Sequence, residues 1–334
     1  MLVMAWVTFG GLSYIQSKQV PAAVTQWGVI NPDASVEDVI NHIQSLPDSP
    51  QFKAEKAEKD KEVEGAEEGK NTVPVSGQDM VDLEQMMGDL INMGETHNAA
   101  NTDYQAKLTQ LCQMYPSSCT ITTMDESYSA QQQFSYQLMV VYVINKLEEF
   151  DYDPLLTLKT VTINNYSTTR RWYANAKLIV INTHQMANYK EFLQVLAHEM
   201  GHVIDLGAIS GTSSQINPDY TEFGKAKFAV DDQSLAFYAI SWSNEDTLRS
   251  RMTNQDFVSG YGMSNPFEDF AECHNMYLYH RDVFAYMAGD SKVLAQKYEY
   301  FDRLYKTRKL SANFNPTDLT TLDVGFRPWD TTRM

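Results

Sequence analysis

The chain has 334 residues, enough for one large domain or two modest ones. Its composition, 43% hydrophobic and 12% aromatic, is that of a globular protein and excludes a chain that is disordered throughout. The formal net charge of −17 argues against nucleic-acid binding, which requires a basic surface, so no nucleic-acid partner is expected.

The N-terminal part of the chain differs in composition from the rest. Residues 1–15 are apolar or small and contain no charged residue, as in the hydrophobic region of a signal peptide. We therefore expect residues 1–22 to be a signal peptide or a membrane anchor, the chain to be exported, and any membrane contact to be made through this segment. Residues 23–77 are predicted to be an N-terminal segment with a flexible linker, because the stretch 50–77 is dense in Lys and Glu.

The following residues alternate between helical and strand patterns. Residues 78–150 are predicted to be mainly helical, and the most apolar stretch, 134–150, is predicted to be a buried helix. Alternating residues rich in β-branched side chains predict strands at 155–165 and 176–186.

Three cysteines bear on the cellular compartment. Cys112 and Cys119 flank a short segment with one proline and two serines, so they could pair in an oxidising compartment or remain two free thiols. Cys273 would be left over. Because the chain has no Cys-x-x-Cys pair, a zinc site built from thiolates is not expected.

A helix with clear end signals follows the second predicted strand. Asn188 with Glu191 has the pattern of an N-terminal capping box, and Gly207 is a typical C-terminal stop, so the stretch between them is predicted to be helical. His198 and His202 lie on this helix, four residues apart, in the pattern His-Glu-x-x-His.

The pattern His-Glu-x-x-His predicts a metal site. Two imidazoles one helical turn apart project from the same face, where a zinc ion can bind both nitrogens at roughly 2.0–2.1 Å. Glu199, next to the first histidine, can reach a water molecule at an open coordination position. The alternative is a buried helix whose histidines only make hydrogen bonds. A third ligand is therefore needed to favour the metal.

The third ligand must come from farther along the chain. The spacing His-x-x-Gly-x-x-His is excluded, because residues 205 and 208 are Asp and Ala. Glu222, which follows His202 by 20 residues, is one candidate. Its surroundings predict a poor helix, and no acidic residue stands four positions later.

The stretch 258–277 contains the better candidate. Asn265 can cap a helix and Pro266 suits its first position, which places Glu268 and Glu272 four residues apart on one face. One carboxylate could bind zinc while the other accepts a proton from a ligand imidazole. Asn265-x-x-Glu268 is also the pattern of a capping box, so a purely structural role for Glu268 stays open.

Taken together, HEMGHVID at 198–205 and the pattern Tyr-x6-Glu-x3-Glu resemble the catalytic domain of anthrax lethal factor and the related Pro-Pro endopeptidases, which are gluzincin-type zinc metallopeptidases. The resemblance covers roughly residues 176–280. It implies peptidase activity with Zn²⁺ as the cofactor. It also implies that Glu268 binds zinc, that Tyr261 points into the site, and that Asp205 supports the metal ligands from behind. We expect Glu272 to support a ligand in the same way.

These observations predict an α+β fold with a zincin-like domain at 78–310 and an extended tail at 311–334. A small sheet should precede the active-site helix, and the lower half should be mostly helical. We expect the strand at 176–184 to line a peptide or protein substrate by pairing along its edge.

The predicted function is that of a zinc-dependent endopeptidase. His198, His202 and Glu268 would hold the metal, Glu199 would act as general base, and Tyr261 would donate a hydrogen bond to the oxyanion. Two alternatives are a catalytically inactive zinc-binding module and a secreted effector whose N-terminal region recognises a partner.

Overall fold

The computed structural model describes residues 77–93, 103–149, 152, 154–166, 172–306, 325 and 327–334. The expected signal peptide or anchor at 1–22 and nearly all of the segment at 23–77 lie outside these residues. In chain order the helices are α3 (Gly77–Met93), α4 (Tyr104–Met114), α5 (Pro116–Thr120), α6 (Ala130–Glu149), α7 (Tyr189–Val203), α8 (Ser234–Ser241), α9 (Pro266–Tyr279), α10 (Arg281–Ala288) and α11 (Lys292–Leu304), and the strands are β1 (Thr122–Met124), β2 (Thr160–Asn164), β3 (Trp172–Asn175), β4 (Leu178–Asn182), β5 (Trp242–Asn244) and β6 (Thr247–Leu248). Among the described residues no helix combines the length and the apolar character that crossing a membrane requires.

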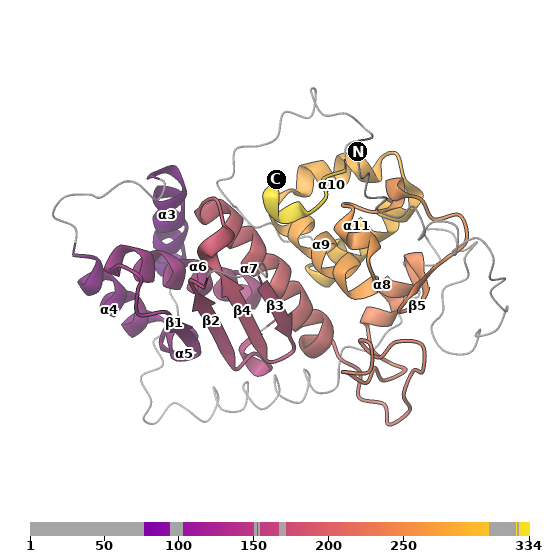
Figure 1. Ribbon diagram of the computed structural model, residues 1–334, viewed down its shortest axis with the longest axis horizontal. Helices are drawn as coiled ribbons and strands as arrows, with labels where there is room; N and C mark the ends of the chain where they lie inside the picture. The colour runs from indigo at the N-terminus through magenta and orange to yellow at the C-terminus, as the bar shows by residue number, and fades with distance from the viewer. Residues whose placement is uncertain are drawn as a thin grey trace, which may run out of the picture.

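The fold is mixed α+β, with a four-stranded sheet in the N-terminal half and helices α8–α11 in the C-terminal half (Figure 1). The strand order is β1-β2-β4-β3, with β1, β2 and β4 parallel and β3 antiparallel to β4. The predicted substrate-pairing strand at 176–184 corresponds to β4, which is bonded to β2 on one side and to β3 on the other. That expectation is therefore wrong, because β4 has no open edge. The edge strands of the described sheet are β1 and β3.

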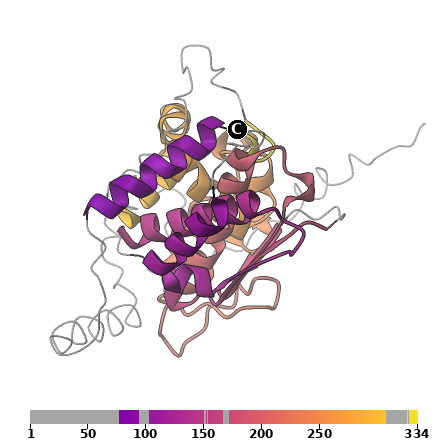
Figure 2. The same ribbon diagram turned by 90° about the vertical axis from the view of Figure 1, so that its left-hand side faces the viewer.

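Residue alternation explains how the sheet packs. Val161 and Ile163 of β2 and Ile179 and Ile181 of β4 are fully buried, and their neighbours along each strand are partly exposed except for Asn182 at the end of β4. Helices α6 and α7 lie behind the sheet in Figure 1. Figure 2 shows α3 and α6 on the same side of the sheet.

The structure decides between a disulfide and two free thiols at Cys112 and Cys119. Cys112 on α4 and Cys119 on α5 form a disulfide, with their Cα atoms 5.5 Å apart. Cys273 remains a buried free thiol on α9.

Aromatic packing and one buried ion pair fix α9 among its neighbours. The ring of Phe270 on α9 lies 5.1 Å from that of Phe237 on α8 and 5.0 Å from that of Phe301 on α11. The ammonium group of Lys297 on α11 lies 2.7 and 2.9 Å from the two carboxylate oxygens of Asp269. Both charged side chains are fully buried, so α9 is held in one position by contacts that tolerate little displacement.

Of the tail predicted to be extended at 311–334, the structure describes residue 325 and residues 327–334, and the remainder lies outside the described residues. Residues 327–334 fold back onto the domain and end in a 3-10 turn at Thr331–Arg333. Thr331 and Thr332 are fully buried, and the segment packs against α7 and α9. The partners of residues 327–334 are distant in the sequence, so the local pattern of this segment carries no sign of them.

Candidate metal centre

Helix α7 carries both histidines of the motif. Its N-cap is Asn188, whose Oδ1 accepts a hydrogen bond from the backbone N–H of Glu191 at 2.9 Å. The Glu191 carboxylate reaches back to the N–H of Ala187 rather than to that of Asn188, so the capping box closes one residue earlier than predicted. The α-helix ends at Val203 and continues as a π-helical turn at Ile204–Ala208, which contains Gly207.

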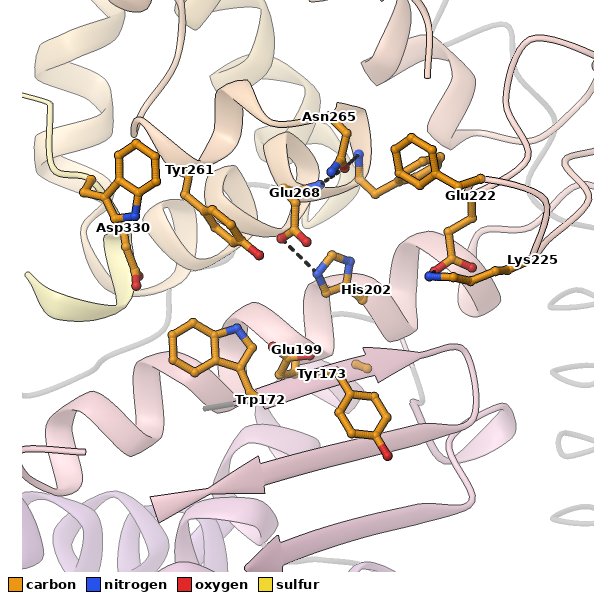
Figure 3. A pocket seen from close by; sticks show the side chains of 14 residues that line it. Trp172, Tyr173, Glu199, His202, Glu222, Lys225, Tyr261, Asn265, Glu268 and Asp330 are labelled. Carbon is orange, nitrogen blue, oxygen red and sulfur yellow. Dashed lines mark hydrogen bonds and ion pairs between the residues drawn. The ribbon is translucent and has the colours of Figure 1, made fainter. Parts of the chain in front are cut away.

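The two histidines converge on one carboxylate from α9. The Nε2 atoms of His198 and His202 lie 3.2 and 3.4 Å from the same oxygen, Oε2 of Glu268. One potential ligand atom from each of the three residues lies within 4.8 Å of the others. Figure 3 shows Glu268 and His202 facing each other across the gap between α9 and α7. The structure thus brings the three sequence-predicted ligands together.

A close helix crossing makes this convergence geometrically feasible. Gly201 lies between the two histidines on α7, where an added Cβ would come within 3.0 Å of the Ala271 Cα and 3.2 Å of the His274 Cβ, both on α9. Any larger residue at 201 would push the helices apart. Glycine therefore sets the separation at which the Glu268 carboxylate reaches both imidazoles.

The start of α9 bears on the two interpretations of Glu268. The side chain of Asn265 caps the helix by accepting hydrogen bonds from the N–H groups of Phe267 and Glu268, at 3.1 and 2.9 Å. This is the Asn half of the predicted capping box. The other half is not formed, because the Glu268 carboxylate is directed to the histidines. Asn265 thus caps α9, whereas Glu268, at the same end of the helix, faces the two histidines.

Glu272 supports His198 from behind. Its Oε1 lies 2.9 Å from Nδ1 of His198, and its Oε2 accepts the backbone N–H of Thr331 at 2.9 Å. This contact directs Nδ1 toward Glu272 and leaves Nε2 as the ring nitrogen that faces Glu268. Metal-binding histidines are usually oriented by such a partner on the opposite ring nitrogen.

The charges of the cluster are mutually dependent. Burial lowers the pKa of both histidines, but Glu268 acts on each of them and Glu272 also acts on His198, so that both pKa values stand above the usual 6.5. Burial raises the pKa of Glu268, but the two imidazoles more than compensate and hold it below its usual value. The carboxylates therefore make this buried point favourable for positive charge, whether protons on the imidazoles or a metal cation.

Glu199 and Tyr261 face the same pocket. Both line it together with His202 and Glu268. Glu199 is almost fully buried, and the ring of Tyr261 is stacked on the imidazole of His198 with centroids 6.1 Å apart. In Figure 3 the Tyr261 hydroxyl points toward Glu268. Burial and the nearby carboxylates, chiefly Glu268, raise the pKa of Tyr261, so its hydroxyl keeps its proton and can donate it in a hydrogen bond.

Asp205 does not support the histidines in the expected way. Both of its carboxylate oxygens accept hydrogen bonds from the hydroxyl of Tyr238, at 2.7 and 2.6 Å. Neither histidine of the motif hydrogen-bonds to Asp205 in the part of the chain that the structure describes. Its side chain instead anchors the π-helical turn after α7 to helix α8. Burial raises its pKa to about 7.

The other residues weighed from the sequence lie away from the cluster. Glu222 lines the pocket beyond His202, on a left-handed backbone (φ 49°), and pairs at 3.9 Å with Lys225. It is not part of the three-residue cluster. His184 lies in the 3-10 turn Thr183–Gln185 that follows β4. It is exposed and lines a separate hollow at the start of α7.

Several pocket residues were not predicted. Trp172 and Tyr173 of β3 form one wall, and Asp330 of the C-terminal segment lies on the side of Tyr261 (Figure 3). Trp329 also lines the pocket, and its carbonyl oxygen accepts the N–H of Tyr261. A signal for β3 was present, because Asn175 and the next two residues form a turn in which Asn175 accepts the N–H groups of Lys177 and Leu178. We find no local signal for the C-terminal pair.

Comparison of the chain with protein-family models, with curated proteins and with solved structures found no match.

Proposed function

We propose that this protein is a zinc-dependent endopeptidase with a zincin-like fold, as the resemblance of its two motifs to gluzincins implies. One observation carries the proposal. His198, His202 and Glu268 direct one ligand atom each to a common point, and Glu199 lines the pocket that opens beside it. Two imidazoles and one carboxylate, with a position left for water, are a usual ligand set of catalytic zinc.

The residues present fit a zinc ion. His198 presents Nε2 to the cluster, because Glu272 holds Nδ1 on the opposite side of the ring. Glu268 supplies the negative charge that a buried divalent cation needs. Bound zinc would lower the pKa of a coordinated water to about 7.

The remaining chemistry belongs to side chains of the pocket. Glu199 would accept the proton of the attacking water and pass it to the leaving amine. Tyr261 would donate a hydrogen bond to the oxyanion of the tetrahedral intermediate, which its protonated hydroxyl can do throughout the neutral range. Glu272 would keep the His198 ring oriented through both steps.

The substrate would be a peptide or a protein segment in extended conformation. Of the two strands next to α7, β3 has the open edge and lines the pocket through Trp172 and Tyr173. An extended substrate that pairs with this edge would pass over Glu199 and beneath Tyr261 (Figure 3). The aromatic side chains at the pocket rim favour substrates with apolar residues near the scissile bond.

The two alternative functions, an inactive zinc-binding module and a secreted effector, require different residues in the site. An inactive zinc-binding module does not need Glu199 or Tyr261 in the pocket, and their presence there favours an enzyme. A secreted effector would be compatible with peptidase activity. Export, as expected from residues 1–22, would agree with the Cys112–Cys119 disulfide, since such bonds persist in oxidising compartments.

Metal analysis followed by digestion of a peptide library tests the proposal. Purified wild-type protein should carry close to one zinc ion per chain, lose it to a chelator, and cleave a subset of the peptides. His198→Ala and His202→Ala should lose both zinc and cleavage. Full zinc content in both variants would contradict the proposal. Zinc binding without cleavage of any peptide would favour the inactive module.

A further inference from the structure

The last residues of the chain contact the turn that carries Tyr261. The N–H groups of Gly260 and Tyr261 donate to the carbonyl oxygens of Pro328 and Trp329, at 2.9 and 2.7 Å. A Cβ on Gly260 would come within 2.7 Å of the Trp329 ring, so glycine at this position allows the indole to lie directly against the turn. Residues 327–334 therefore hold one wall of the pocket by backbone pairing and by packing.

The same segment also contacts both ligand-bearing helices. On α7, Nε2 of Gln194 donates to the carbonyl oxygen of Met334 at 3.1 Å. On α9, Nδ2 of Asn275 donates to Oγ1 of Thr331 at 2.9 Å, and the N–H of Thr331 donates to Oε2 of Glu272 at 2.9 Å. The segment thus bridges the two helices whose separation determines the geometry of the cluster.

We infer that residues 327–334 form a C-terminal latch that positions Glu272, and through it His198, for metal binding. The inference rests on the proposed zinc site. Glu272 is fully buried, and its two oxygens accept one hydrogen bond each, from His198 and from Thr331. Losing the Thr331 N–H would leave a buried oxygen unsatisfied and free the carboxylate to turn away from His198. Thr331 is therefore a positioning residue that acts through its main chain.

The turn that presents the Thr331 N–H is itself well fixed. Oδ1 of Asp330 accepts the backbone N–H of Thr332 at 2.7 Å and also the Thr332 hydroxyl. The side chains of Asp330, Thr331 and Thr332 are all buried. Asp330 acts here as the N-cap of the 3-10 turn, so removing its acceptor oxygen should loosen the latch without touching Glu272.

Thr331→Pro removes the critical N–H with little demand on the backbone. Thr331 is the first residue of the turn, a position where the fixed φ of proline is accepted, and Asp330 has the extended conformation (φ −150°, ψ 126°) that proline prefers before it. Thr331→Val is the matched control. It keeps the N–H and the shape of the side chain, and loses only the hydroxyl that Asn275 contacts.

Zinc affinity in full-length protein, measured by competition with a chelator, should fall roughly ten-fold in Thr331→Pro, as for loss of a group that orients a metal ligand. Thr331→Val should retain affinity close to that of the wild type, even where its melting temperature falls. In a Glu272→Gln background, Thr331→Pro should cause no further loss, because both changes break the same contact. The absorption spectrum of cobalt-substituted protein should change in Thr331→Pro and not in Thr331→Val.

Two Asp330 variants provide a second test that does not depend on the folding of Thr331→Pro. Asp330→Ala should weaken zinc binding, and Asp330→Asn, which keeps the capping oxygen but removes the charge, should restore it. Wild-type zinc affinity in both Thr331→Pro and Asp330→Ala would overturn the latch and leave the proposed function intact. A wild-type protein that binds no zinc would overturn both. Additive losses in the Glu272→Gln background would show a general structural effect and also overturn the latch.

Discussion

Nδ1 of His198 lies 2.9 Å from Oε1 of Glu272, and both side chains are fully buried. The pair joins the motif on α7 to the second helix of the site, α9. Because the carboxylate accepts the ring proton, it sets the orientation of the imidazole and increases the basicity of the opposite nitrogen. The contact therefore connects the position of α9 with the affinity of the centre for metal.

Glu272→Gln should weaken zinc binding about 10–100-fold, the usual effect of losing the partner of a metal-binding histidine. A neutral amide can still occupy the space, but it cannot accept from His198 and from Thr331 with a full negative charge. Chelator competition measures the change. Asp232→Asn, which likewise replaces a buried carboxylate by its amide and whose contacts are with Gly211 and Ser234, is the control and should keep its zinc affinity. Equal loss in the two variants would mean that the effect is not specific to His198.

The separate functions at the start of α9 predict opposite effects for two substitutions. Asn265→Ala removes the helix cap and should lower the free energy of unfolding by about 1 kcal/mol while zinc content stays near that of the wild type. Glu268→Ala should abolish zinc binding but leave the cap in place. Metal analysis and denaturant unfolding of the apo-proteins distinguish the two. If Glu268→Gln kept both zinc and activity, Glu268 would not be a ligand, and Glu222 would be the next candidate.

The sequence was sufficient where the relevant contacts are local. His198 and His202 share a helix face by their spacing, and the signals at Asn188 and Asn265 correctly marked the starts of α7 and α9. The spacing of Glu268 and Glu272 also placed one carboxylate toward the histidines and the next behind His198.

Tertiary contacts account for what the sequence did not reveal. β3 is a four-residue strand with no fully buried side chain, so it lacks the alternation that identified β2 and β4. The π-helical turn at Ile204–Ala208 replaces the predicted end of the helix, because Asp205 bonds to Tyr238 on a later helix. The C-terminal segment is fixed by partners more than fifty residues away, such as Glu272, and a single sequence does not encode those contacts locally.

Asp232 predicts a pH dependence of stability that is separate from the metal centre. Burial, together with the charge of Asp205, raises the pKa of Asp232 from its usual 3.8 to about 8. An acid whose pKa is raised in the folded state contributes stability below the unfolded pKa, and this contribution is lost as the pH rises through the folded value. Asp232→Asn cannot ionise and should therefore gain stability relative to the wild type between about pH 4 and 8. Urea unfolding at pH 5 and pH 8 measures this difference, and an unchanged difference would contradict the prediction.

Glu199→Gln and Tyr261→Phe test the two chemical functions of the pocket. Neither residue belongs to the ligand cluster, so both variants should retain zinc and fold normally. Removing the base at Glu199 should lower peptide hydrolysis by roughly 10²–10⁴-fold. Hydrolysis by Glu199→Gln at the wild-type rate would mean that the activity lies elsewhere.

Tyr261→Phe should lower kcat by roughly 10²–10³-fold and change KM little, because the hydroxyl would bind the oxyanion and not the ground-state carbonyl. Its ring would remain stacked on His198, so the metal centre should be undisturbed. Tyr173→Phe is the control, since Tyr173 lines the same pocket but its hydroxyl points away from Glu199 and Glu268 in Figure 3. Steady-state kinetics on a peptide from the library digest would separate kcat from KM. A rise in KM at constant kcat in Tyr261→Phe would show that Tyr261 binds substrate and does not stabilise the transition state.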